Sequence, residues 1–208
     1  MLRTNTLRAM GLFLIMVGMC CPVSAGKYNE VLSIGDAAPV WKDLPGTDGK
    51  KHSLADLKDK KAVVVVFTCA SCPYSVDYED RIQALAKQHL GPKSEVAVVA
   101  ICVNLIAVDR LPKLTERAKQ KGFVFQYLSD ESQRSAKAYG SIFTPQFFVL
   151  NAERKVIYMG AMDDSTDATK VKVQYVQAAI QAALKGERPA VTETETPGCM
   201  TRYTRERK

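Results

Sequence analysis

The feature that most constrains the fold is Ala62–Phe67, an uninterrupted run of apolar and mostly β-branched side chains. A strand with one exposed face alternates apolar and polar residues, whereas a strand covered on both faces is apolar throughout. Parallel sheets are covered on both faces. The run therefore predicts a central strand in an α/β domain, and a chain of 208 residues is long enough to bury one core.

After this run the apolar residues take up helical spacing. From residue 73 to residue 90 they recur every three or four positions, on a stripe that includes Tyr78, Ile82 and Leu85. A Gly-Pro pair ends the stripe, and Val96–Val103 is a second apolar run. The order strand, helix, strand predicts a parallel βαβ unit with a right-handed crossover.

The rest of the chain continues this alternation. The predicted elements are a helix over Leu111–Ala118, a strand over Phe123–Leu128, a helix over Glu131–Tyr139, strands over Gln146–Leu150 and Lys155–Met159, and a helix over Val173–Leu184. The last two strands are separated by a four-residue turn, which predicts an antiparallel pair. Turn signals within residues 39–61 predict a further hairpin before the central strand. The pattern is that of a central mixed β-sheet flanked by helices, with an N-terminal hairpin extension.

Residues 1–25 have the pattern of a secretory signal. Arg3 and Arg8 precede an apolar stretch that is short for a spanning helix, and small residues at 23–25 suit cleavage. Cys20 and Cys21 leave a lipoprotein signal as an alternative, although Met19 suits it poorly, and an uncleaved anchor is another. We expect an exported protein, periplasmic or otherwise extracytoplasmic, in a compartment where disulfides persist.

The remaining chain divides into one domain and a short end segment. Residues 26–186 form the predicted domain, and residues 187–208 are predicted to be a loose polar tail because Pro, Thr and Glu dominate there. The net charge is +7, and most of the excess of basic over acidic residues lies at the two ends of the chain. No basic stripe of the kind that binds nucleic acid crosses the domain. We therefore expect no nucleic-acid partner, and membrane contact only through the signal or the basic tail.

Four cysteines follow the signal, and a domain of this length does not need disulfides to fold. They are Cys69, Cys72, Cys102 and Cys199. Cys69 and Cys72 are separated by two residues, between the apolar strand and the next helix, which is the context of a redox pair. Unpaired amides and the helix dipole favour an anion there, so we expect Cys69 to be the attacking thiolate and Cys72 to resolve the mixed disulfide. A structural disulfide is the alternative, although so short a loop constrains the unfolded chain little.

Several further segments complete a resemblance to a known family. They are Gly35–Pro39, Val63–Pro73, Phe123–Pro145 and Gly160–Asp164, within residues 33–200. With them the chain resembles the thioredoxin-like redoxin superfamily, which includes the alkyl hydroperoxide reductase and thiol-specific antioxidant group. The resemblance implies a thioredoxin-like fold and a thiol–disulfide oxidoreductase without a cofactor. It also implies a cis-proline at Pro145, preceded by Thr144, that faces the redox pair and aligns a substrate strand. The partners would be protein or small-molecule thiols and disulfides, with an unidentified redox partner.

The chain also departs from thioredoxin itself. Thr68 stands where thioredoxin has a tryptophan, Val63 where it buries an acid, and Ala70-Ser71 where it has Gly-Pro. The direction of electron flow, which depends on the reduction potential, is therefore open.

Two rival functions fit the motifs less well. A peroxiredoxin requires Thr or Ser three residues before its reactive cysteine and Pro four residues earlier, and neither Cys69 nor Cys72 meets this spacing. Copper-carrying relatives use Cys-x-x-x-Cys-Pro with a distant histidine, whereas this spacing is one residue shorter. His52 and His89 are the only histidines, and we expect no metal site.

The other two cysteines receive separate interpretations. Cys102 ends an apolar strand, so we expect a small buried side chain without a redox role. Cys199 follows Pro197-Gly198 in the polar tail. Either it folds back as an additional redox thiol for the Cys69–Cys72 pair, or it is a structural or unpaired tail thiol.

Overall fold

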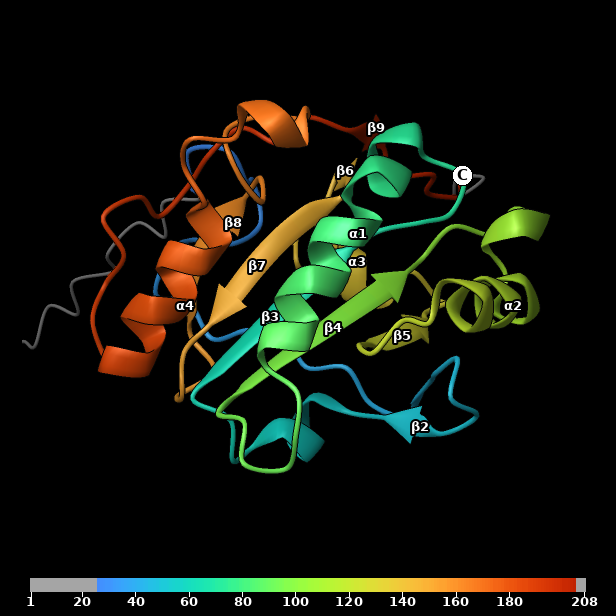
Figure 1. Ribbon diagram of the computed structural model, residues 1–208, viewed down its shortest axis with the longest axis horizontal. Helices are drawn as coiled ribbons and strands as arrows, with labels where there is room; N and C mark the ends of the chain where they lie inside the picture. Colours follow the sequence, from blue (N-terminus) through green and yellow to red (C-terminus); the bar gives the residue numbers. More distant parts are fainter. Residues whose placement is uncertain (1–25, 205–208) are drawn as a thin grey trace, which may run out of the picture.

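The structure is a computed structural model that describes residues 26–204. The predicted signal at residues 1–25 and the last four residues of the chain therefore lie outside the described residues. Figure 1 shows a central sheet with helices on its two faces.

The central sheet has five strands in the order β5-β4-β3-β7-β8. They are β3 (Ala62–Phe67), β4 (Val96–Cys102), β5 (Gln126–Ser129), β7 (Gln146–Leu150) and β8 (Val156–Gly160). Strand β3 pairs in parallel with β4, and β4 with β5, whereas β7 runs antiparallel to both β3 and β8. The predicted mixed sheet, with the apolar run at its centre, is confirmed.

Within residues 26–204, four α-helices and three short 3₁₀ helices surround the sheet. The α-helices are α1 (Pro73–Gln88), α2 (Leu111–Lys121), α3 (Arg134–Ala138) and α4 (Tyr175–Lys185), and the 3₁₀ helices are η1 (Leu54–Leu57), η2 (Ala107–Asp109) and η3 (Ala168–Lys170). In Figure 1, α1 and α4 cover the near face of the sheet and α3 lies behind it. No helix within residues 26–204 is long and apolar enough to cross a membrane.

Strand β3 separates two hydrophobic cores because its side chains alternate between the two faces. Val64 and Val66 pack with the apolar stripes of α1 and α4. Val63, Val65 and Phe67 pack with α3 and the segment before β3. All six side chains of β3 are fully buried, and each buried aliphatic side chain contributes about 1.5–3 kcal/mol to folding. This burial fixes the point at which β3 ends and the cysteine loop begins.

The predicted N-terminal hairpin is present but small. Strands β1 (Leu44–Pro45) and β2 (Lys51–His52) pair antiparallel. Helix η1 follows, and the Ser53 N–H donates to the Asp56 carboxylate at 2.7 Å, which caps its first turn.

Two predicted element boundaries are displaced around β5. The strand begins at Gln126 rather than at residue 123, and α3 begins at Arg134 rather than at residue 131. The second shift has a local cause, because the Asp130 carboxylate accepts hydrogen bonds from the N–H groups of Ser132 and Ser135. These bonds hold residues 130–133 in a turn before the helix begins.

The prediction of a loose tail is wrong for residues 187–204. The Met159 N–H of strand β8 donates to the Thr192 carbonyl, and the Thr194 N–H donates back to Met159. Further along, β9 (Cys199–Met200) pairs antiparallel with β6 (Phe143–Thr144). Backbone hydrogen bonds to existing edges hold this segment, and such bonds require no hydrophobic periodicity. In Figure 1 it runs from α4 across the top of the sheet to β6.

Candidate active site

The two cysteines of the Cys-x-x-Cys motif lie in a tight loop between β3 and α1. Ala70 and Ser71 form a turn, and Cys72 is the N-cap of α1, with Pro73 as its first residue. Cys69 and Cys72 are both reduced, and each is only 2% exposed.

A single buried carboxylate holds the loop. Asp109, at the end of η2, accepts hydrogen bonds from the backbone N–H groups of Ala70 and Ser71 at 2.8 and 3.0 Å. It also accepts from the Ser71 hydroxyl at 2.6 Å and from Asn104 Nδ2 at 3.0 Å. Asp109 is fully buried, so these four donors replace its hydration. Sequence reasoning missed Asp109 because it lies about forty positions from the loop and belongs to no spacing motif.

Thr144, which precedes Pro145, contacts the cysteines. The Thr144–Pro145 peptide bond is cis, as the resemblance implies. The Cys72 thiol donates to the Thr144 carbonyl at 3.1 Å, and Cys69 Sγ lies 3.6 Å from Thr144 Oγ1. Thr144 therefore contacts both sulfur atoms.

The surroundings of Cys69 oppose its expected ionisation. Burial raises the pKa of Cys69, and the negative charge of Asp109 raises it further, against weaker hydrogen bonds from Ser71 and Thr144. The physical reason is the turn at Ala70 and Ser71, which delays the start of α1. Cys72, not Cys69, therefore lies at the helix N-terminus.

Cys72 has the opposite tendency. Burial acts to raise its pKa, but hydrogen bonding with the Cys199 thiol, with the Thr144 side chain and with the Ser75 N–H outweighs it and lowers the pKa below its usual value. The Ser75 N–H is one of the unpaired amides of the first helical turn, which stabilise an anion at the N-cap. Cys72 is therefore the thiol of this pair that ionises first.

Cys199 lies beside the other two cysteines. Strand β9 places it directly opposite Thr144 in the β6–β9 pair, and the Thr144 hydroxyl donates to the Cys199 carbonyl at 3.4 Å. Hydrogen bonding to Cys72 raises the pKa of Cys199 to about 11. Cys69, Cys72 and Cys199 line one cavity of about 20 Å³. The segment thus folds back onto the pair, as one of the two sequence interpretations requires.

The remaining candidate residues lie apart from this cluster. Cys102 is 1% exposed, as expected for a small buried side chain, and burial raises its pKa strongly. His52 Nε2 lies 3.0 Å from Asp48, and His89 caps the C-terminal end of α1, opposite Cys72. Among residues 26–204, no three or more His, Cys, Asp and Glu side chains form a group that could hold a metal ion.

The helix that carries Cys72 is anchored by a buried ion pair. Arg81 Nη1 lies 2.7 Å from Asp163 Oδ2, and the guanidinium stacks 3.6 Å from the centre of the Tyr78 ring. The Tyr78 hydroxyl also donates to Asp163 at 3.1 Å. These contacts join α1 to the segment after β8 and fix the position of its N-terminus.

Solved structures with the same arrangement of elements include two informative cases. A hypothetical protein of Sinorhizobium meliloti is 32% identical, with a TM-score of 0.77, over 85% of this chain and 97% of that one. A thiol:disulfide interchange protein of the thioredoxin family from Chlorobium tepidum is 23% identical, with a TM-score of 0.53, over 64% of this chain and 90% of that one. The second likeness concerns the fold alone. Fold and cysteine site together define a thioredoxin-like α/β protein.

Sequence comparison identifies the family within that class. The profile of the Redoxin family matches residues 33–177, and the chain belongs to this family. A Mycobacterium tuberculosis protein that is provisionally named a peroxiredoxin is 26% identical over 121 residues. The match covers 56% of this chain and 69% of that protein. Cys199 lies beyond the matched region.

Proposed function

We propose that this chain is an exported thiol–disulfide oxidoreductase that exchanges disulfides with protein or small-molecule thiols through Cys69 and Cys72. The observation that carries the proposal is the convergence of both sulfur atoms on Thr144, with Cys72 at the N-terminus of α1. A thiolate stabilised at a helix N-terminus and a second thiol within reach are the two components that disulfide exchange requires.

The proposed reaction begins with the Cys72 thiolate. It attacks one sulfur of a substrate disulfide, a mixed disulfide forms, and the other substrate sulfur leaves as a thiolate and takes up a proton. Cys69 then attacks Cys72 Sγ, which releases the second substrate thiol and leaves a Cys69–Cys72 disulfide. An external dithiol reduces this disulfide to complete the cycle. The same steps in reverse oxidise a substrate dithiol, and the reduction potential decides between the directions.

Thr144 and Asp109 are the proposed positioning residues of this reaction. Asp109 holds the backbone between the cysteines through Ala70 and Ser71. Thr144 offers its carbonyl to Cys72 and its hydroxyl to Cys69. The Thr144 hydroxyl can donate to a Cys69 thiolate and so offset part of the cost of forming it, whereas the Thr144 carbonyl accepts from the protonated Cys72 thiol and favours that form.

Export is supported by the sequence of residues 1–25. Arg3 and Arg8 precede an apolar stretch and small residues, which together resemble a cleavable signal. Fractionation of cells that express the full chain tests this, because an exported protein appears outside the cytosol with its signal removed. A full-length cytosolic product would contradict export.

A disulfide-reduction assay tests the activity. Insulin turnover with dithiothreitol is measured for the wild type, Cys69→Ser and Cys72→Ser, with Cys102→Ala as the matched control. We expect the two serine variants to fall to the uncatalysed rate and Cys102→Ala to retain activity, because Cys102 does not line the cavity. Wild-type turnover in Cys72→Ser would contradict the proposal.

A thiol peroxidase is the second candidate, favoured by the peroxiredoxin-named relative and by the Cys72 thiolate. It predicts hydrogen peroxide consumption with dithiothreitol that depends on Cys72, and a sulfenic acid at Cys72 that dimedone traps. Peroxide consumption no faster than that of Cys72→Ser would exclude this candidate while leaving disulfide exchange intact.

A further inference from the structure

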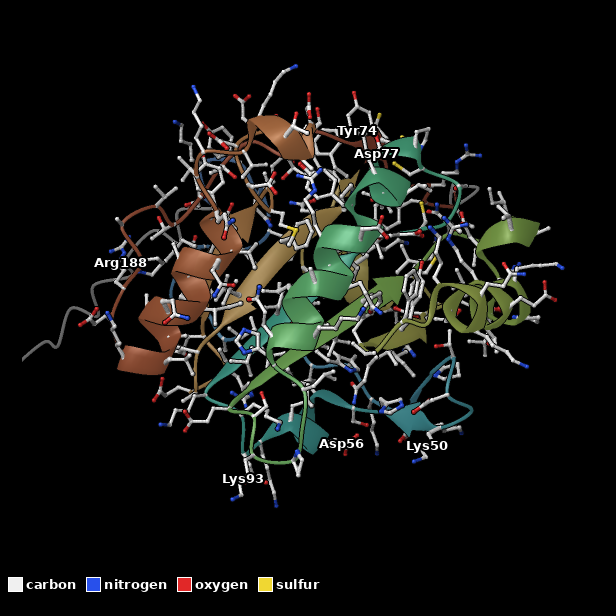
Figure 2. The ribbon with its side chains drawn as sticks, viewed as in Figure 1. Lys50, Asp56, Tyr74, Asp77, Lys93 and Arg188 are labelled. Carbon is white, nitrogen blue, oxygen red and sulfur yellow. The ribbon has the colours of Figure 1, made fainter. Side chains whose placement is uncertain are left out.

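The redox pair is covered, whereas Cys199 is not. Cys69 and Cys72 are each 2% exposed, so a protein disulfide cannot reach either sulfur in this conformation. Cys199 is half-buried, and its neighbour Met200 is 76% exposed. Tyr74, whose backbone N–H acts to lower the pKa of Cys199, stands at the surface end of α1 beside Asp77 (Figure 2). Of the three clustered sulfur atoms, that of Cys199 is the one nearest to solvent.

Strand β9 occupies an edge at which an extended peptide could dock. It pairs antiparallel with β6 immediately before Pro145, with Cys199 opposite Thr144 and Met200 opposite Phe143. Adding a strand to an open sheet edge is a general mode of peptide recognition. Here the chain supplies that strand itself, and the strand delivers a cysteine to the redox pair.

Thr144 joins all three cysteines. Its carbonyl accepts from Cys72, its hydroxyl lies 3.6 Å from Cys69 Sγ, and the same hydroxyl donates to the carbonyl of Cys199. Cys199 lines the same cavity as Cys69 and Cys72, and hydrogen bonding with Cys199 lowers the pKa of Cys72. Cys72 is also the largest cause of the raised pKa of Cys199, so we take Cys72 as its partner in the pair.

The segment around Cys199 is also tied to the redox loop. The Arg202 N–H donates to Asn104 Oδ1 at 3.2 Å, and Asn104 Nδ2 donates to Asp109. Gln133 Nε2 donates to the Arg202 carbonyl at 2.9 Å. A chain of hydrogen bonds therefore runs from residue 202 through Asn104 and Asp109 to the backbone of the loop. Such a connection holds the third sulfur in place relative to the other two.

We propose that Cys199 is the entry thiol of a three-cysteine relay, in which external disulfides react at Cys199 and a Cys72–Cys199 disulfide passes the oxidation inward to Cys69. The proposal rests on the proposed function, but it moves the first attack on the external disulfide from Cys72 to Cys199.

The relay consists of three thiol–disulfide exchange steps. Cys199 attacks an external disulfide and forms a mixed disulfide, while its proton passes by way of Cys72 to the departing substrate thiolate. The Cys72 thiolate then attacks Cys199 Sγ, so that the Cys72–Cys199 bond forms and the second substrate sulfur leaves and is protonated. Finally Cys69 attacks Cys72 Sγ, and Cys199 leaves with the proton that Cys69 loses. The substrate gains two electrons, and the chain holds a Cys69–Cys72 disulfide that an external dithiol reduces.

The electrostatics of the site favour the second step, whereas the first step requires Cys199, whose pKa is raised to about 11, to give up its proton. Cys72 is the thiol with the lowered pKa, so it is the nucleophile for the second step. Hydrogen bonding with Cys72 is the largest cause that raises the pKa of Cys199. That cause disappears once Cys72 is part of a disulfide, and Cys199 then ionises more easily for the reverse reaction.

Peptide mapping tests the relay directly. Trypsin leaves Cys69 and Cys72 together in residues 62–81, Cys199 in residues 186–202 and Cys102 in residues 94–110. The full chain is equilibrated in graded glutathione redox buffers, quenched with acid, alkylated and digested without reduction. In Cys69→Ser, we expect a disulfide between residues 62–81 and 186–202 as the main linked species, which can only join Cys72 to Cys199. In the wild type, we expect the same Cys72–Cys199 disulfide to appear transiently after oxidised glutathione is added to the reduced protein.

Kinetics supply the second measurement. Cys199→Ser should reduce insulin turnover by about tenfold or more, while its Cys69–Cys72 disulfide still forms at equilibrium, because only the entry sulfur is missing. Cys102→Ala serves as the control with the same number of cysteines. Unchanged turnover in Cys199→Ser, or no Cys72–Cys199 linkage in Cys69→Ser in any redox buffer, would overturn the relay. In that case the loss of turnover in Cys72→Ser would still support the proposed function, whereas wild-type turnover in Cys72→Ser would end both.

Discussion

The cysteine loop and the C-terminal segment meet at Thr144, but different forces hold them in place. The loop extends from the fully buried strand β3, and one carboxylate, that of Asp109, fixes its backbone. Residues 187–204 are held by separate contacts, from Thr192 against β8 to Thr201, whose N–H donates to the Ile142 carbonyl. The loop therefore depends on a single carboxylate, whereas the segment depends on many weak hydrogen bonds.

This difference teaches where each region is vulnerable. A buried carboxylate that satisfies several donors is costly to remove, because the donors remain buried without partners. Separate backbone hydrogen bonds each contribute little, so part of such a segment can detach while the core stays folded. The proposed relay places its entry thiol, Cys199, on the weakly held segment and Cys72 next to the firmly held loop.

The largest effect is expected at Asp109. Replacing Asp109 by alanine leaves the part-buried N–H groups of Ala70 and Ser71 without their acceptor, and should lower the free energy of unfolding by about 3 kcal/mol. Asp109→Asn is the matched control, since its amide oxygen can still accept, and should lose about half as much. Urea denaturation measures both. Equal stability of Asp109→Ala and the wild type would show that the loop does not depend on this carboxylate.

The second effect tests the connection between the two regions. Asn104→Ala removes the donor to Asp109 and the acceptor for the Arg202 N–H, and should cost about 1–2 kcal/mol. Hydrogen exchange should increase in both regions. Ser94→Ala, which removes a hydroxyl that bonds only near the start of β4, is the control and should leave both regions unchanged. Faster exchange in only one region would contradict a shared network.

The third effect is confined to the segment. A Cβ on Gly198 would lie 2.5 Å from the Thr144 carbonyl oxygen, so Gly198→Ala should displace β9 at a cost of about 1 kcal/mol. Alkylation of Cys72 by iodoacetamide should then become faster, because its cover moves away. Met200→Ala changes an exposed side chain of the same strand and is the control. An unchanged alkylation rate in Gly198→Ala would mean that β9 does not shield the pair.

The smallest effect concerns the ionisation of Cys72. Hydrogen bonding by Cys199 lowers the pKa of Cys72, so Cys199→Ala should raise it and shift the pH profile of Cys72 alkylation to higher pH. Cys199→Ser retains a hydroxyl donor and should shift the profile less. Measurement in a Cys69→Ser background reports on Cys72 separately from Cys69. A profile that moves to lower pH in Cys199→Ala would contradict the assigned direction.

The sequence by itself determined the elements that bury apolar surface. The run Ala62–Phe67, the stripe of α1 and the short turn between β7 and β8 each follow a period that burial imposes, and the structure has all three. The position of Cys69 and Cys72 between strand and helix could also be predicted from the local sequence. The C-terminal segment lacks such a period, so the sequence did not reveal that residues 187–204 are held against the sheet.

Only the tertiary structure decided the chemistry of the individual sulfur atoms. Whether Cys69 or Cys72 ionises first depends on where α1 begins, on the charge of Asp109 and on the thiol of Cys199. Asp109 and Cys199 are distant from the loop in sequence and meet it only when the fold closes. Electrostatic and hydrogen-bond effects depend on distance in space, whereas the pattern of apolar residues records only which faces are buried.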